Sequence, residues 1–189
     1  ADDGGNRRCI LVQLPEPLAG GESVGWTSIA DITKARLVGA GKRQRAADVA
    51  KAGDVGFRVF KLDTSNIRAW NPNAADLKGS LFANLEHIEP GRSNDDVLYE
   101  VLLKLGLDLC VSIEQQQIAG KTVHSIGAGA LLACLDEHIS AADAEPLALG
   151  MAQWREQQGT ATETTAVFRD SAFENDVAKS NLAAILEQH

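Results

Sequence analysis

The sequence predicts an α/β fold in two parts: a strand–helix–strand unit, followed by an α+β region that contains an antiparallel meander. Three patterns lead to this prediction. Two short apolar segments, residues 9–14 and 57–62, flank a helical pattern in the first half. Three alternating segments separated by glycine turns lie in the second half. Amphipathic helical patterns stand on both sides of these three segments.

The first half predicts a βαβ unit. Residues 9–14 form an apolar run that prolines end, which is typical of a buried strand. Thr27 or Ser28 can cap the helix that follows and extends toward Ala50. Residues 57–62 alternate between apolar and polar side chains, as a second strand does. A strand–helix–strand segment of this length joins parallel strands, so a parallel sheet is expected here.

The second half begins with a helix that Ser93 caps and Gly106 ends. A serine hydroxyl accepts a hydrogen bond from an unpaired amide, and glycine adopts the left-handed conformation that closes many helices. The antiparallel meander follows, with strands at 111–116, 122–125 and 131–135 and with turns at 119–120 and 127–129. The sequence then predicts a helix over 142–157, a strand over 164–168 and a helix over 173–187.

Composition excludes several classes of protein. The 189 residues carry 26 acidic and 18 basic side chains, for a formal net charge of −8. This acidity argues against a free-standing DNA-binding domain, which normally has a basic face. No apolar run is long enough to span a bilayer, and no signal peptide opens the chain, so a cytoplasmic protein without membrane contact is expected. The three cysteines lie far apart in apolar runs, which predicts reduced core thiols.

Short motifs in the sequence are incomplete. Residues 39–42, GAGK, lack the first glycine and the final Ser or Thr of a phosphate-binding loop. Residues 127–129, GAG, lack the third glycine of a dinucleotide fingerprint and precede a predicted strand instead of following one. The four histidines have no metal-ligand spacing. These motifs therefore predict neither a cofactor nor a metal, and they disfavour a Rossmann oxidoreductase.

Four longer stretches carry a resemblance. They are GNRRCILVQLPE at 5–16, GFRVFKLDTSN at 56–66, GALLACLD at 129–136 and VFRDSAFEND at 167–176, the last followed by Lys179 and Asn181. In order and spacing they resemble the C-terminal part of the methylation subunit of type III restriction–modification systems, which is an adenine-specific DNA methyltransferase. The resemblance extends over nearly the whole chain.

The resemblance implies a division of the chain into two domains. Residues 1–63 correspond to the C-terminal part of the methyltransferase core, a partial Rossmann-like sheet, and residues 64–189 to an α+β assembly region. In that family the catalytic Asp-Pro-Pro-Tyr turn and the Phe-x-Gly-Ser-Gly methyl-donor loop come earlier, and this chain contains neither. The family sequence also continues past both ends of the chain. The resemblance therefore implies a fragment that is inactive alone.

Two acidic residues correspond to cofactor contacts in that fold. Glu16 follows the first predicted strand, where a carboxylate commonly accepts hydrogen bonds from the ribose hydroxyls of S-adenosylmethionine. The alternative is a solvated loop carboxylate. Asp63 follows the second predicted strand, where adenine or substrate contacts cluster, although the segment 63–66 equally suits a helix cap. Trp26 and Trp70, in linking segments, are the aromatic residues that could stack on a flipped adenine.

Two functions stay open at this point. In the first, the chain is part of an S-adenosylmethionine-dependent adenine-N6 methyltransferase and reaches DNA only through the full-length enzyme. In the second, the residues beyond about Thr64 form a non-catalytic module that pairs two methylation subunits or docks the restriction subunit, so a homo-oligomer is expected. The acidic charge and the lack of polar constellations favour protein partners for this module.

Overall fold

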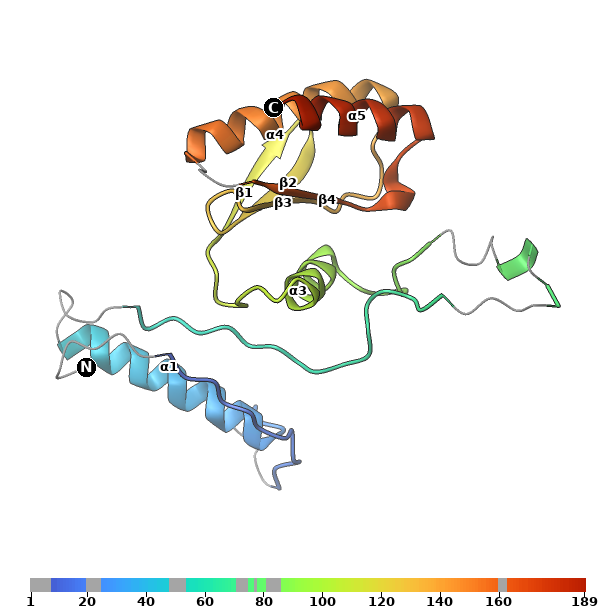
Figure 1. Cartoon of the computed structure of the whole chain (residues 1–189). Helices are drawn as coiled ribbons and strands as arrows, with labels where there is room; N and C mark the ends of the chain where they lie inside the picture. Colours follow the sequence, from blue (N-terminus) through green and yellow to red (C-terminus); the bar gives the residue numbers. More distant parts are fainter. Residues whose placement is uncertain are drawn as a thin grey trace. The chain divides into compact units, whose positions relative to one another are not determined.

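The computed structural model describes residues 8–19, 25–47, 54–70, 75–76, 78–80, 86–159 and 163–189. The chain divides into two compact units, Ala1–Lys61 and Leu62–His189 (Figure 1). The architecture is mixed α and β. No helix in the described ranges is both long and apolar enough to cross a membrane.

The first unit is built on helix α1 (Ile29–Ala47). The helix begins directly after Ser28, where the cap was predicted, but the Thr27 and Ser28 hydroxyls donate hydrogen bonds to Asp31. The carboxylate of Asp31, in the first turn, accepts hydrogen bonds of 3.0 Å from the amides and hydroxyls of both Thr27 and Ser28. The chain before the helix folds back onto this end, because the Glu16 carbonyl accepts a hydrogen bond from the Ile29 amide. The predicted continuation toward Ala50 lies outside the described residues.

The two strands predicted in the first half are wrong. Neither 9–14 nor 57–62 pairs with any strand that the structure describes. Their apolar side chains lie in solvent: Ile10, Val12 and Leu62 are 93%, 91% and 98% exposed. An apolar run becomes a strand only when a neighbour completes its backbone hydrogen bonds and covers its side chains. None of the described strands is such a neighbour for either run, so the described residues form no βαβ unit in the first half.

The second unit contains a four-stranded sheet in the order β1-β2-β3-β4. The antiparallel meander is confirmed in strands β1 (Ile113–Ile118), β2 (Lys121–Ile126) and β3 (Leu131–Cys134). Strand β1 begins and ends two residues later than predicted. The turn after it has positive φ at both Ala119 (50°) and Gly120 (75°), which is the type I′ turn that favours a tight hairpin. Strand β4 (Thr165–Phe168) lies parallel to β3.

Helices in the second unit agree with the sequence patterns. Helix α3 (Asn94–Lys104) has the predicted serine cap: the Ser93 hydroxyl accepts from the Asp96 amide, and the Asp96 carboxylate accepts from the Ser93 amide. Gly106 follows the helix with φ 71°, as expected for a residue that closes one. The remaining helical segments are α4 (Ala141–Gln158), the short 3₁₀ turn η2 (Asp170–Ala172) and α5 (Asp176–Gln188).

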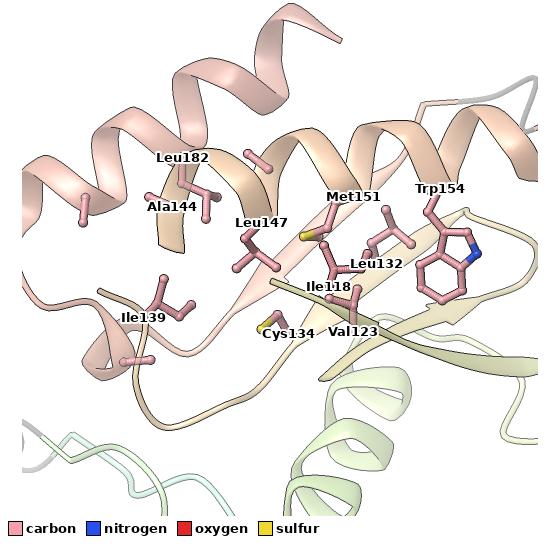
Figure 2. Close-up of a cluster of buried hydrophobic side chains, with 13 residues drawn as sticks. Ile118, Val123, Leu132, Cys134, Ile139, Ala144, Leu147, Met151, Trp154 and Leu182 are labelled. Atoms are coloured by element: carbon pink, nitrogen blue, oxygen red, sulfur yellow. The ribbon is translucent and has the colours of Figure 1, made fainter. Parts of the chain in front are cut away.

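Helices cover both faces of the sheet. Helices α4 and α5 lie on one side and α3 on the other (Figure 1). Strand β3 is buried on both faces, because successive side chains point in opposite directions. Leu132 and Cys134 face Leu147 and Met151 of α4 (Figure 2). Leu131 and Ala133 belong to the α3 side, with Val97, Leu98, Leu102, Ile126 and Leu135. Each large apolar side chain buried here contributes about 1.5–3 kcal/mol.

Candidate functional site

A groove of about 520 Å³ lies in the second unit, where the segment after Leu62 passes the loop that leads into α3. Short backbone pairing holds its two walls together. The Glu89 amide donates to the Asn66 carbonyl at 2.8 Å, and Ile67 and Ile88 form an antiparallel bridge. The residues that line the groove are Thr64, Ser65, Ile67, Ala69, Glu89, Pro90, Gly91 and Arg92.

An ion pair closes one end of this groove. The Arg92 guanidinium contacts the Asp63 carboxylate at 3.0 Å through Nη1 and donates from Nη2 to the Thr64 hydroxyl at 2.9 Å. The other Asp63 oxygen accepts from the Thr64 amide at 2.7 Å. The hydrogen bond to Asp63 raises the pKa of Arg92 and outweighs the opposing effect of desolvation. Arg92 therefore stays charged, and its contacts with Asp63 and Thr64 fix the segment to the loop.

Glu100 of α3 binds the segment that forms one wall of the groove. Its carboxylate accepts hydrogen bonds from the Ser65 hydroxyl and the Asn66 amide, and it contacts Lys104 at 3.0 Å. Partial desolvation favours the neutral acid, but the hydrogen bonds from Ser65, Asn66 and Lys104 together outweigh it and lower the pKa of Glu100 to about 2. The carboxylate is therefore ionised and structural at neutral pH.

Glu16 and Asp63, the two predicted cofactor ligands, lie in different units. The Glu16 side chain is exposed, and its contact with ribose stays a prediction. Asp63 stands at the groove, but both of its oxygens already accept hydrogen bonds, from Arg92 and Thr64. The alternative helix cap at 63–66 is wrong, since residues 64–70 contain no helix.

The tryptophans divide between core and surface. Trp154 is 7% exposed and packs in the core between α4 and the sheet, as its place on a helix predicts. Trp70 follows the groove-lining residue Ala69 and is 57% exposed. Of the aromatic residues considered for stacking, Trp70 is thus accessible from solvent, while Trp26 is half-buried.

Thiols and imidazoles provide no metal centre in the described ranges, where no three His, Cys, Asp or Glu residues cluster suitably. The prediction of buried thiols is confirmed for Cys134, whose pKa burial raises to about 11. It is wrong for Cys9 and Cys110, which are exposed. His124 is 8% exposed on β2, and its Nδ1 has no hydrogen-bond partner among the described atoms.

Sequence reasoning missed Arg92 and Glu100. Both are common surface residue types, and each acts on a partner about thirty residues away in sequence. No short sequence motif predicts such a pairing. The sequence indicates that Asp63 and Ser65 favour loops, but it does not indicate their hydrogen-bond partners.

No protein-family model, curated protein or solved structure matches this chain. The relation to type III methylation subunits therefore rests on the four sequence stretches alone. The fold of the second unit and the groove are seen in the structure itself and do not depend on that resemblance.

Proposed function

We propose that the chain is the C-terminal part of a site-specific adenine-N6 DNA methyltransferase of the type III restriction–modification class. In this proposal, residues 1–63 complete the catalytic core, and residues 64–189 form an assembly region without catalytic groups. The chain is inactive alone. It reaches DNA through the rest of the enzyme, which supplies the Asp-Pro-Pro-Tyr turn and the methyl-donor loop.

The exposure of the first unit carries this proposal. None of the residues described between 8 and 61 is buried. Val12, Val59 and Phe60 are 91%, 60% and 48% exposed, although each belongs to an apolar run of strand-like composition. Burying a side chain of this size contributes about 1.5–3 kcal/mol, so several such contributions are not realised in this unit by itself.

A partner sheet accounts for this pattern. Two apolar-rich runs flanking one helix suit the strands of a parallel sheet. Residues 9–14 have no charged side chain, as in a strand buried on both faces, whereas residues 57–62 alternate, as in a strand with one face buried. Neighbouring strands of a methyltransferase core would complete the ladders of residues 9–14 and 57–62 and cover their side chains. The partial Rossmann-like sheet would then form on assembly.

S-adenosylmethionine supplies the methyl group in this proposal. Glu16 fits a role in binding it, because its exposed carboxylate follows an apolar run and can accept hydrogen bonds from two ribose hydroxyls. Asp63 fits less well, since Arg92 and the Thr64 amide engage both of its oxygens. A contact between Asp63 and the cofactor would require Arg92 to release it.

The second unit supports the assembly part of the proposal. Ion pairs join Arg92 to Asp63 and Lys121 of β2 to Asp143 of α4, and the buried side chains of the unit are almost all apolar. Such a unit suits a protein partner better than a chemical reaction. The partners proposed are a second methylation subunit and the restriction subunit.

The genomic DNA before the Ala1 codon provides the first test. We expect an open frame that encodes Phe-x-Gly-Ser-Gly shortly upstream and Asp-Pro-Pro-Tyr several hundred codons earlier. A stop codon followed by a start signal for this chain would remove the catalytic part of the proposal.

Hydrogen exchange provides the second test. In the chain alone, the amides of 9–14 should exchange at the rates of an unfolded peptide, and in the full-length enzyme the amides of both 9–14 and 57–62 should be protected. The amides of β2 are the internal control, protected in both samples. Protection of 9–14 in the chain alone, or exchange of either run at unfolded rates within the full enzyme, would contradict the proposed sheet completion.

A further inference from the structure

Strand β1 is the edge of the sheet in the second unit, and among the strands that the structure describes it pairs only with β2. Its residues 114–117 are all exposed. An edge strand presents a row of unpaired backbone donors and acceptors, which another strand can bind. A partner of this edge must therefore match the backbone groups and side chains that β1 exposes.

Hairpin geometry identifies the groups that point outward. Ile118 and Lys121 flank the two-residue type I′ turn and form a hydrogen-bonded pair. Hydrogen-bonded and non-hydrogen-bonded pairs alternate along an antiparallel ladder. The hydrogen bond from the Gly127 amide to the Ser112 carbonyl confirms this alternation. The amides and carbonyls directed away from β2 are therefore those of Ile113, Gln115 and Gln117.

This edge lacks the usual protection against pairing. Proteins guard edge strands with charged residues, prolines, bulges or short length. Strand β1 has six residues, a regular register with β2, no proline, and Glu114 as its one charged residue. The opposite edge differs. Strand β4 has four residues and leads directly into Arg169, which is paired with Glu86 and Glu137.

We propose that β1 binds β1 of a second copy of this chain, antiparallel, about a twofold axis perpendicular to the sheet. The two sheets become one continuous sheet, with both α4 helices on the same face. This inference stands on the edge geometry and does not rest on the methyltransferase proposal.

The face on which each side chain lies, the length of strand that is paired and the charge of Glu114 together select one register. Directly opposed residues lie on the same face, and each hydrogen-bonded pair must join two residues whose backbone groups point outward. The register that opposes Gln115 to the partner's Gln115 meets both conditions and uses the whole strand. It places Glu114 beside the partner's Gln116, whose amide can donate to the carboxylate. A slip by two residues in one direction opposes the two Glu114 carboxylates, which is destabilising.

A second feature favours the same arrangement. A groove of about 190 Å³ lies between β1 and α4, and its lining residues are Gln116, Gln117, Ile118, Gly150, Gln153, Trp154 and Gln157. Glutamine amides both donate and accept hydrogen bonds, so they complement a copy of themselves. In the proposed pair, Gln116 of this groove opposes the partner's Glu114. An edge that has one charged residue, and whose Gln116 and Glu114 pair twice about a twofold axis, fits a second copy better than a strongly charged partner.

Cysteine cross-linking tests the register. In a chain with Cys9→Ser and Cys110→Ser, Gln115→Cys should form an intermolecular disulfide under mild oxidation, because the two Cα atoms lie about 5.5 Å apart. The matched control is Gln117→Cys. Its two copies are displaced by four residues along the strand, about 14 Å, so they should not cross-link. Equal cross-linking of both variants, or of neither, would overturn the proposed register.

Light scattering tests the pairing itself. The full chain should have twice the mass of one copy. Gln115→Lys should return it to one copy, because two lysines then oppose each other at the twofold axis. Gln188→Lys, on the exposed end of α5, changes the net charge equally and should leave the dimer intact. Circular dichroism of both variants shows that the fold is kept. A single-copy mass for the unmodified chain, or dimers that survive Gln115→Lys, would overturn the inference.

Discussion

The carboxylate of Glu100 accepts a hydrogen bond from the backbone amide of Asn66, 2.6 Å away and 34 residues earlier in the sequence. A second hydrogen bond joins the Asn66 side-chain amide to the carbonyl of Asp96, one turn earlier on α3. Helix α3 thus holds a segment that has no helix or strand of its own.

Replacement of Glu100 by Gln should destabilise the second unit by about 1.5–3 kcal/mol, because the hydrogen bonds from Ser65 and Asn66 lose their charged acceptor. Urea unfolding followed by circular dichroism measures this change. Glu145→Gln, on the exposed side of α4, is the matched control and should stay within about 0.5 kcal/mol of the original chain. Equal stability of the two variants would contradict the anchoring role.

Acid should destabilise the second unit. The pKa of Glu100 is lowered from 4.5 to about 2, where hydrogen bonds from Ser65, Asn66 and Lys104 outweigh desolvation. The pKa of Asp143 is lowered from 3.8 to about 2 by hydrogen bonds from the Ser140 amide and hydroxyl and from Lys121. A lowered folded-state pKa gives stability that is present above the unfolded value and lost as pH falls through the folded value.

Thermal unfolding at a series of pH values checks this expectation. The midpoint Tm should be constant from about pH 7 to 5 and should fall between about pH 4.5 and 2, the window set by these two groups. The fall should be smaller in Glu100→Gln, which has no carboxylate to protonate at that position. A variant whose acid profile parallels that of the original chain would assign the pH dependence to other groups.

Gly150 marks the closest approach of α4 to β1. A Cβ atom at this position would lie 2.3 Å from Cγ2 of Ile118, which is shorter than any real contact. Gly150→Ala should therefore destabilise the second unit by about 1–3 kcal/mol, although alanine favours helix by about 1 kcal/mol. Gly39→Ala, in α1 with open space around it, is the control and should not alter that transition. Urea unfolding distinguishes the two, and unchanged stability of Gly150→Ala would contradict the close packing.

The three cysteines should react in two classes. Cys9 and Cys110 are exposed and should react rapidly with a thiol reagent under native conditions. Cys134 is fully buried, and its raised pKa leaves little thiolate at neutral pH, so it should react only on unfolding. Rapid labelling of all three thiols in the native protein would show that the core between β3 and α4 opens readily.

The elements of the second unit were predictable because their signals are local. Ser93 and Asp96 form both halves of a capping box within four residues, and the turn at Ala119 and Gly120 fixes a hairpin by itself. The error in β1 arose from its apolar start at Val111. The turn geometry, and not the apolar run, determines where this strand ends.

The first unit was predicted wrongly because a strand is not a local property. Residues 9–14 and 57–62 have the right composition, but pairing depends on a neighbour that composition does not reveal. The groove was unpredictable for a similar reason. Asp63 and Arg92 meet through the path of the chain between them, which no pattern in the sequence specifies.

The parallel pairing of β3 and β4 has a consequence for the order of folding. Within the meander, strands join across two-residue and four-residue connections, whereas Leu131 pairs with Thr165 only after α4 has formed the crossover. Closing a longer loop costs more chain entropy before any contact offsets it. We therefore expect the hairpins to assemble early and β4 to dock late onto a surface that already exists, so that the sheet grows from the β1 side toward β4.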